Sequence, residues 1–249
     1  MGVHQSCPSL AAAWTETFAS FAPLHWLRRV KGGVRRRPAP MNIDQQNNVD
    51  EMVRALAEAL VAVWSYLHLL RGFQRGGQSQ PLVLERFGRL FDQTWRAIFD
   101  ALFAKAGTLI DRRKGTYSLP NLLKSIRRCG NPELKDALAY VETRLNDSTG
   151  PMVKLKNWRH QVVAHRTKEG RDDDFYQSNK MHLEDVESAV IELEQLLNRL
   201  SVGVLAIHND TRSGSLGLVD QGASLFASIA AEPRVPGASS QAARSELER

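Results

Sequence analysis

The sequence predicts an all-α protein, a bundle of about five or six helices with flexible N- and C-terminal extensions. Apolar residues recur at intervals of three and four over successive stretches between about residues 48 and 207, which is the period of amphipathic helices. No stretch keeps the two-residue alternation of a half-buried strand. Residues that cap or break helices separate these stretches, so we expect the helices to bury their apolar faces against one another.

The first helix is expected to begin at Asn48 or Asp50, because either side chain can accept a hydrogen bond from the free backbone N–H groups of a first turn. We expect it to end at Gly72 or at the pair Gly76 and Gly77, since glycine is unfavourable inside a helix. Its apolar face is defined by Met52, Leu56, Leu60, Val63, Leu67 and Leu70.

The following helices are predicted from similar signals. One runs from about residue 81 to near 107, and a short one between 118 and 130 opens with Ser-Leu-Pro and ends at a glycine. The next occupies about 131–145, and its Asn-Pro-Glu start suits a helix because proline is tolerated in the first turn. An amphipathic segment over 152–166 comes next, and after a polar loop a last helix is expected over about 183–207.

Three regions follow from composition: a basic flexible extension over residues 1–40, a helical domain over 41–208, and a Gly/Ser-rich linker with a disordered tail over 209–249. One amphipathic turn is expected within the last region, around residues 225–229. The first region holds six basic residues and one acid, and so carries most of the net charge of +6. The nearly neutral remainder excludes a uniformly basic, phosphate-coating surface.

The cysteines and the hydropathy restrict the setting of the protein. Cys7 and Cys129 lie far apart and match no metal or redox spacing, so we expect a reducing, cytoplasmic location. The sequence contains no zinc pattern and no phosphate-binding loop, and we expect neither a metal nor a cofactor. It contains no run of eighteen apolar residues, so we expect no membrane partner.

The segment over 152–166 places a charge where packing alone would not. On a helical wheel, Arg159 falls inside the apolar sector and His165 falls at its edge, whereas His160 points away from it. An arginine in an apolar sector must be paired or must face a cleft, because burying an unpaired charge costs several kcal/mol. The sector itself is made by Met152, Leu155, Trp158, Val162 and Val163.

Arg159 and His165 together supply the groups that metal-free RNA cleavage requires. Imidazole can act as acid or base near neutral pH, and the planar guanidinium suits phosphate oxygens. Because a single histidine does not easily perform both proton transfers, a two-fold dimer would supply the second imidazole.

A structural interpretation stays open beside this catalytic one. In it, Arg159 pairs with a carboxylate such as Glu142 or Asp185, and His165 packs on Trp158. An open cleft around the arginine would favour catalysis, whereas a closed ion pair would favour a structural role. His68, in the first helix, is expected to be a packing residue.

Residues 159–165, Arg-His-Gln-Val-Val-Ala-His, resemble the R-x(4–6)-H signature of HEPN-domain proteins. They are similar above all to the Arg-polar-x-x-x-Ala-His form of the AbiU-type abortive-infection and toxin–antitoxin HEPN proteins, and the resemblance covers about residues 43–207. It implies a HEPN-like bundle that dimerises and cleaves RNA without a metal, in some cases beside a nucleotidyltransferase-type antitoxin. It also implies that Arg159 and His165 are catalytic and that His160 is the polar residue after the arginine, where asparagine or aspartate is commoner.

We therefore expect a metal-independent RNA endonuclease of a defence or toxin–antitoxin system, with an Arg/His site shared by a homodimer. The alternative is a non-catalytic helical interaction module that binds a partner protein or nucleic acid.

Overall fold

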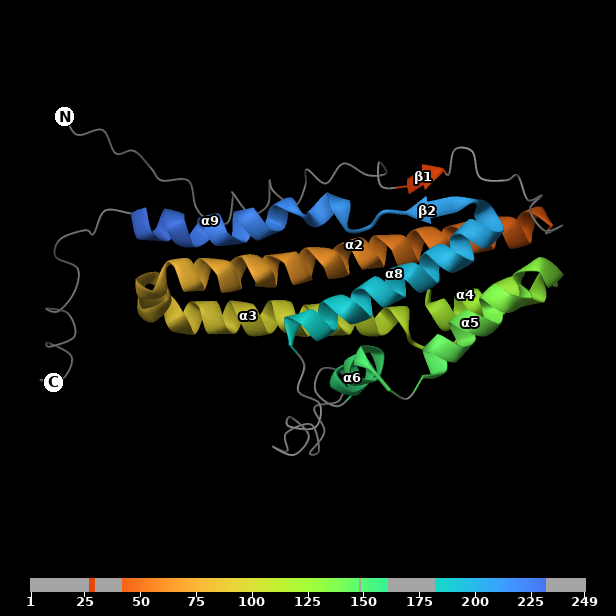
Figure 1. The fold of residues 1–249 in the computed structure, drawn as a ribbon, viewed down its shortest axis with the longest axis horizontal. Helices are drawn as coiled ribbons and strands as arrows, with labels where there is room; N and C mark the ends of the chain where they lie inside the picture. The colour runs from red at the N-terminus through yellow and green to blue at the C-terminus, as the bar shows by residue number, and fades with distance from the viewer. Residues whose placement is uncertain (1–26, 30–41, 148, 161–181, 232–249) are drawn as a thin grey trace, which may run out of the picture.

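The computed structural model describes residues 27–29, 42–147, 149–160 and 182–231, and helices make up nearly all of them (Figure 1). The prediction of an all-α bundle is confirmed. The α-helices of this part of the chain are α2 (Ile43–Ser79), α3 (Pro81–Leu109), α4 (Leu119–Arg128), α5 (Lys135–Asn146), α6 (Pro151–Trp158), α8 (Leu183–Leu205) and α9 (Gly217–Ala231).

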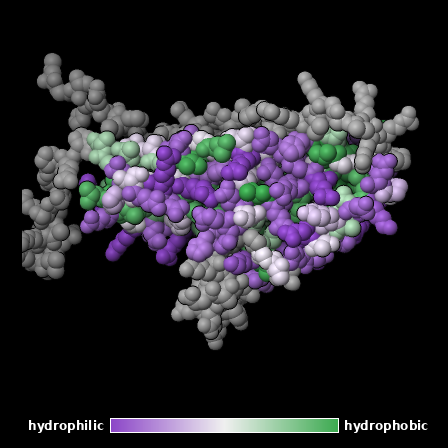
Figure 2. Space-filling model, in the orientation of Figure 1, coloured by the Kyte–Doolittle hydropathy of each residue, from purple (hydrophilic) through white to green (hydrophobic). Residues whose placement is uncertain are grey.

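Helix α2 is the centre of the bundle and packs against α3, α4, α8 and α9 (Figure 1). It contains an apolar stretch that by length and composition could cross a membrane, but 56% of that stretch is buried inside the structure. The face of the molecule in Figure 2 is mostly hydrophilic, with apolar residues in separate small groups. The apolar stretch of α2 is therefore explained by its central place in the bundle.

The N-terminus of α2 lies earlier than the sequence predicted. Asn42 caps the helix, because its side chain accepts a hydrogen bond from the backbone N–H of Gln45 at 2.8 Å, and the Gln45 side chain accepts one from the backbone of Asn42. This reciprocal pair is a capping box. The predicted caps Asn48 and Asp50 lie inside the helix, where Asp50 forms an ion pair with Arg54.

The glycines expected to end the first helix do not end it. Gly72 and Gly76 lie within α2, where they let α9 approach closely. A Cβ atom on Gly72 would lie 2.6 Å from the backbone oxygen of Val219, and one on Gly76 would lie 2.4 Å from the ring of Phe226. The tertiary contact with α9 therefore outweighs the poor helix propensity of glycine.

The other predicted helices are present with small shifts in their bounds, and the segment predicted over 152–166 is present as far as it is described, since residues 161–181 lie outside the described residues. Ser118 caps α4 by accepting a hydrogen bond from the backbone N–H of Asn121. A short 3-10 turn over Pro132–Leu134 precedes α5. Helix α8 ends at Ala206, which has a left-handed conformation with φ of 54°.

The two predicted extensions contain ordered elements. Strand β1 (Leu27–Arg29), within the N-terminal extension, pairs antiparallel with β2 (Ile207–Asn209). The C-terminal segment that was expected to be a linker and tail contains a 3-10 turn over Ser213–Ser215 and helix α9, which packs on α2. The helical signal of this segment in the sequence is weak, because the apolar face of α9 is short and interrupted by Gly and Ser.

We predict that Gly72→Ala destabilises the protein by about 1–3 kcal/mol, because the added methyl group meets backbone atoms of α9 that cannot easily move. Gly88→Ala in α3 is the matched control, since a Cβ atom there meets nothing within 4 Å. Because alanine has a higher helix propensity than glycine, the free energy of unfolding of that variant should be unchanged or higher by up to about 1 kcal/mol. Urea denaturation of both variants measures the difference, and equal stability would show that α9 does not pack tightly on α2.

Candidate active site around Arg159

Helix α6 presents the predicted apolar face to the bundle. Met152 and Leu155 are buried, and α6 packs against α3 and α8 (Figure 1). The half-buried Trp158 ring lies against Phe99 and Phe103 of α3, with ring centroids 5.6 and 5.5 Å apart. These contacts fix the end of α6 against the C-terminal half of α3.

Arg159 follows α6 directly and lies over a glycine of α3. A Cβ atom on Gly107 would lie 2.3 Å from Cγ of Arg159 and 2.7 Å from its Cδ. Only a glycine therefore allows the arginine side chain to lie this close to the α3 backbone.

Asp111 fixes the other end of the Arg159 side chain. Nη2 of Arg159 donates a hydrogen bond to Oδ2 of Asp111 at 3.0 Å, and the two side chains are only 23% and 12% exposed. The second carboxylate oxygen, Oδ1, accepts a hydrogen bond from the backbone N–H of Arg113 at 3.0 Å. One carboxylate thus joins the arginine to the chain that follows α3.

The surroundings of Asp111 keep it ionised. Burial raises the pKa of Asp111, but the hydrogen bond from the Arg113 backbone and the positive charge of Arg159 lower it further, so the net pKa lies below the ordinary value. At neutral pH the pair is therefore a carboxylate and a guanidinium.

The partners that the structural interpretation named for Arg159 were wrong. Glu142 pairs with Arg127 on the surface, and Asp185 accepts a hydrogen bond from the backbone of His182 at the start of α8. Asp111 and Gly107 are the residues that sequence reasoning missed. Gly107 lies in the last turn of α3 and Asp111 directly after the helix, so no periodic pattern in the sequence links either of them to Arg159.

Of the two histidines predicted in the motif, His160 is among the described residues and His165 is not. His160 has an exposed side chain at the end of the α6 segment, consistent with its place outside the apolar sector. His165 lies outside the described residues. Among those described, no group of three or more His, Cys, Asp or Glu side chains is placed to hold a metal ion.

His68 is a buried packing residue, as predicted. It is 3% exposed, its Nδ1 lies 2.9 Å from Oγ of Ser215, and its ring stacks on Trp64 with centroids 5.3 Å apart. The contact joins α2 to the turn that precedes α9. A histidine so enclosed cannot reach a substrate.

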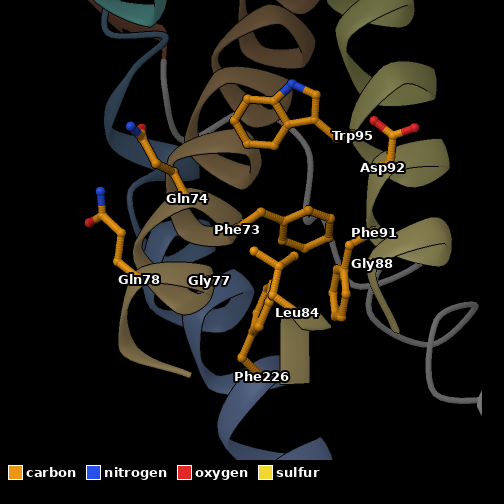
Figure 3. A pocket seen from close by; sticks show the side chains of 10 residues that line it. All are labelled: Phe73, Gln74, Gly77, Gln78, Leu84, Gly88, Phe91, Asp92, Trp95 and Phe226. Atoms are coloured by element: carbon orange, nitrogen blue, oxygen red, sulfur yellow. The ribbon is translucent and has the colours of Figure 1, made fainter. Parts of the chain in front are cut away.

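A separate apolar cavity of about 410 Å³ lies where α2, α3 and α9 meet (Figure 3). The side chains of Phe73, Leu84, Phe91 and Phe226 gather around it, and Asp92, its one acid, pairs with Arg96. Apart from this carboxylate, the described lining contains no side chain that titrates. It also lies toward the opposite end of α3 from Gly107, so the candidate active site is the Arg159 region.

The comparisons with known proteins identify a family but no site residues. The family model of the HEPN group described as AbiU2 matches residues 46–215, from within the first turn of α2 to the Ser213–Ser215 turn. Neither a curated protein nor a solved structure matches the chain.

We predict that His68 makes the protein less stable in mild acid. Burial lowers the pKa of His68 below its ordinary value of 6.5, against the opposing hydrogen bond to Ser215. As the pH falls below 6.5, His68 of the unfolded chain is therefore protonated before His68 of the folded protein. Protonation thus favours the unfolded chain, and the free energy of unfolding falls.

Urea denaturation at about pH 8 and pH 5 should show a smaller loss of stability for His68→Gln than for the wild type. His208→Gln, which changes an exposed histidine, should behave as the wild type does. An equal loss in all three proteins would show that His68 is not held in the neutral form.

Proposed function

The chain belongs to the AbiU2 family of HEPN proteins, and from that membership we propose that it is a metal-independent RNA endonuclease in a defence or toxin–antitoxin system. The proposed catalytic residues are Arg159 and His165, with His160 as the polar residue of the motif. Imidazole moves the protons of the 2′-hydroxyl and of the leaving 5′-oxygen, and the guanidinium stabilises the phosphorane charge.

The observation that supports this proposal most is the way Arg159 is held. Gly107 receives its aliphatic stem and Asp111 binds its guanidinium, so the charge has a fixed position before any substrate arrives. A cation that is already positioned need not reorganise as negative charge develops on the phosphate. The side chain also keeps 23% of its surface exposed, which leaves room for a phosphate oxygen.

We propose that the active form is a cytoplasmic homodimer, which places two copies of the Arg/His motif together. A nucleotidyltransferase-type antitoxin is the partner that this class of HEPN protein suggests. RNA is the substrate, and neither a metal nor a cofactor takes part.

A second function is favoured by one observation. Arg159 lies in an ion pair with Asp111, and a closed pair was the arrangement expected of a non-catalytic interaction module. In that case the pair serves only to attach α6 to α3. The experiments below separate the two functions, because an attachment residue affects stability and a catalytic residue affects turnover.

We predict that His165→Ala abolishes RNA cleavage and that Arg159→Ala lowers it about 10²–10³-fold, while both variants remain helical and soluble. Gly107→Ala should also lower cleavage, because the added methyl group displaces the stem of Arg159. Cleavage of labelled RNA and circular dichroism give the two measurements. A variant that melts the protein instead would favour the interaction module.

The same assay tests the chemistry. Cleavage should survive EDTA and should leave 2′,3′-cyclic phosphate ends, because the attacking group is the adjacent 2′-hydroxyl. Complete loss of cleavage on chelation, restored by a divalent metal, would overturn this mechanism, and so would 3′-hydroxyl products.

A mixing experiment tests the shared site. If both imidazoles of a dimer are needed, an equal mixture of wild-type and His165→Ala chains, refolded together, should retain about one quarter of the wild-type activity. Independent sites would retain about one half. Sedimentation of the full chain at the assay concentration should show a dimer, and a fully active monomer would refute the shared site.

A further inference from the structure

The loop between α3 and α4 carries three consecutive basic residues, Arg112, Arg113 and Lys114, directly after Asp111. All three are exposed. Because Asp111 also binds Arg159, this run begins next to the proposed catalytic arginine.

Hydrogen bonds to several elements hold the loop in place. Asp111 binds Arg159 beyond α6, and Nη2 of Arg112 donates to the side-chain oxygen of Asn146 at the end of α5. The side-chain amide of Asn121 in α4 donates to the backbone oxygens of Arg113 and Thr116, at 2.7 and 2.9 Å.

The loop also turns tightly and returns to α2. Gly115 has φ of 84°, a conformation that favours glycine. The hydroxyl of Tyr117 then donates to Glu51 of α2. The basic side chains are therefore presented by a backbone that is fixed at both ends.

The basic side chains of this run form no direct ion pair with a described carboxylate, although Asp111 and Glu142 are close enough to attract Arg113 and Arg112. Arg113 and Lys114 form no ion pair with a described carboxylate, and the described partner of Arg112 is the neutral Asn146. Two arginines of the neighbouring helices are paired by contrast, since Arg127 binds Glu142, and Arg144 binds Asp147 and Glu192. A fixed cluster of unpaired cations beside a phosphate-binding arginine suits a polyanion.

An aromatic side chain adjoins the cations. Tyr117 is 48% exposed although its hydroxyl is bonded to Glu51, so its ring is accessible at the surface. Basic side chains together with an exposed aromatic ring are typical of surfaces that bind single-stranded nucleic acid, where the ring stacks on a base.

We propose that the loop formed by Arg112, Arg113 and Lys114 binds the backbone of single-stranded RNA next to the scissile phosphate, and that Asp111 sets its position relative to Arg159. This inference rests on the proposed nuclease function. The loop contacts the substrate equally before and during the reaction, so it contributes to binding and not to turnover.

The test compares two double variants that each remove two positive charges. Arg113→Gln/Lys114→Gln changes the loop, and Arg86→Gln/Arg89→Gln changes exposed residues near the opposite end of α3, about 30 Å away along the helix. Binding of fluorescein-labelled oligouridylate is measured by anisotropy in the His165→Ala background, where cleavage does not interfere. Thermal denaturation checks that each variant is folded.

The loop variant should raise Kd about tenfold at 0.15 M salt and should lower the slope of log K against log salt by about 1.4, or about 0.7 for each lost phosphate contact. The control variant should change Kd by less than about twofold, since a general reduction in charge acts weakly at this salt concentration. In the cleavage-competent chain the loop variant should raise KM and leave kcat unchanged.

The outcomes separate the two proposals. If the wild type cleaves RNA and both double variants bind RNA as tightly as the parent chain does, the loop assignment is overturned and the nuclease proposal stands. Loop-dependent binding without any cleavage would support the loop and overturn the nuclease. Equal weakening of both variants would show nonspecific attraction, and would count against the loop. Absence of RNA binding and of cleavage would overturn both.

Discussion

The bundle depends on the covering of α2. This helix buries a broad apolar face, which includes Val53, Trp64 and Leu67, none of which is exposed at all. Such a helix is stable in water only when other helices surround it, and α3, α4, α8 and α9 all pack against it. The two glycines that face α9 show how tight this requirement is, because they sacrifice helix propensity to let the last helix approach.

The same kind of close contact fixes Arg159. A glycine of α3 provides space for the arginine stem, and an aspartate one turn further along provides its counter-charge. Without the aspartate, an arginine side chain with less than a quarter of its surface exposed would be left without its carboxylate partner. The ion pair is thus required by burial, and a fixed cation for phosphate chemistry is available as a result.

Asp111 also connects the proposed catalytic group to the proposed substrate-binding loop. Its two oxygens bind different segments, so a shift of the loop and a shift of Arg159 are coupled through one side chain. The buried contact of His68 with Ser215 has a different role. It joins α2 to the turn before α9 and encloses an imidazole that substrates cannot reach, which explains why burial alone does not identify a catalytic histidine.

The helical class, the positions of most helices and the unusual place of Arg159 could be predicted from the sequence, because they follow from periodicity and from local capping. The predicted ends of the first helix were wrong, and α9 was predicted only as a single amphipathic turn. The role of Gly72 and Gly76 depends on a segment almost 150 residues away in the chain. The carboxylates predicted for Arg159 were also wrong. Only the tertiary structure decided that Asp111 is the partner, because a salt bridge between residues 48 positions apart depends on how α3 and α6 pack and leaves no local pattern.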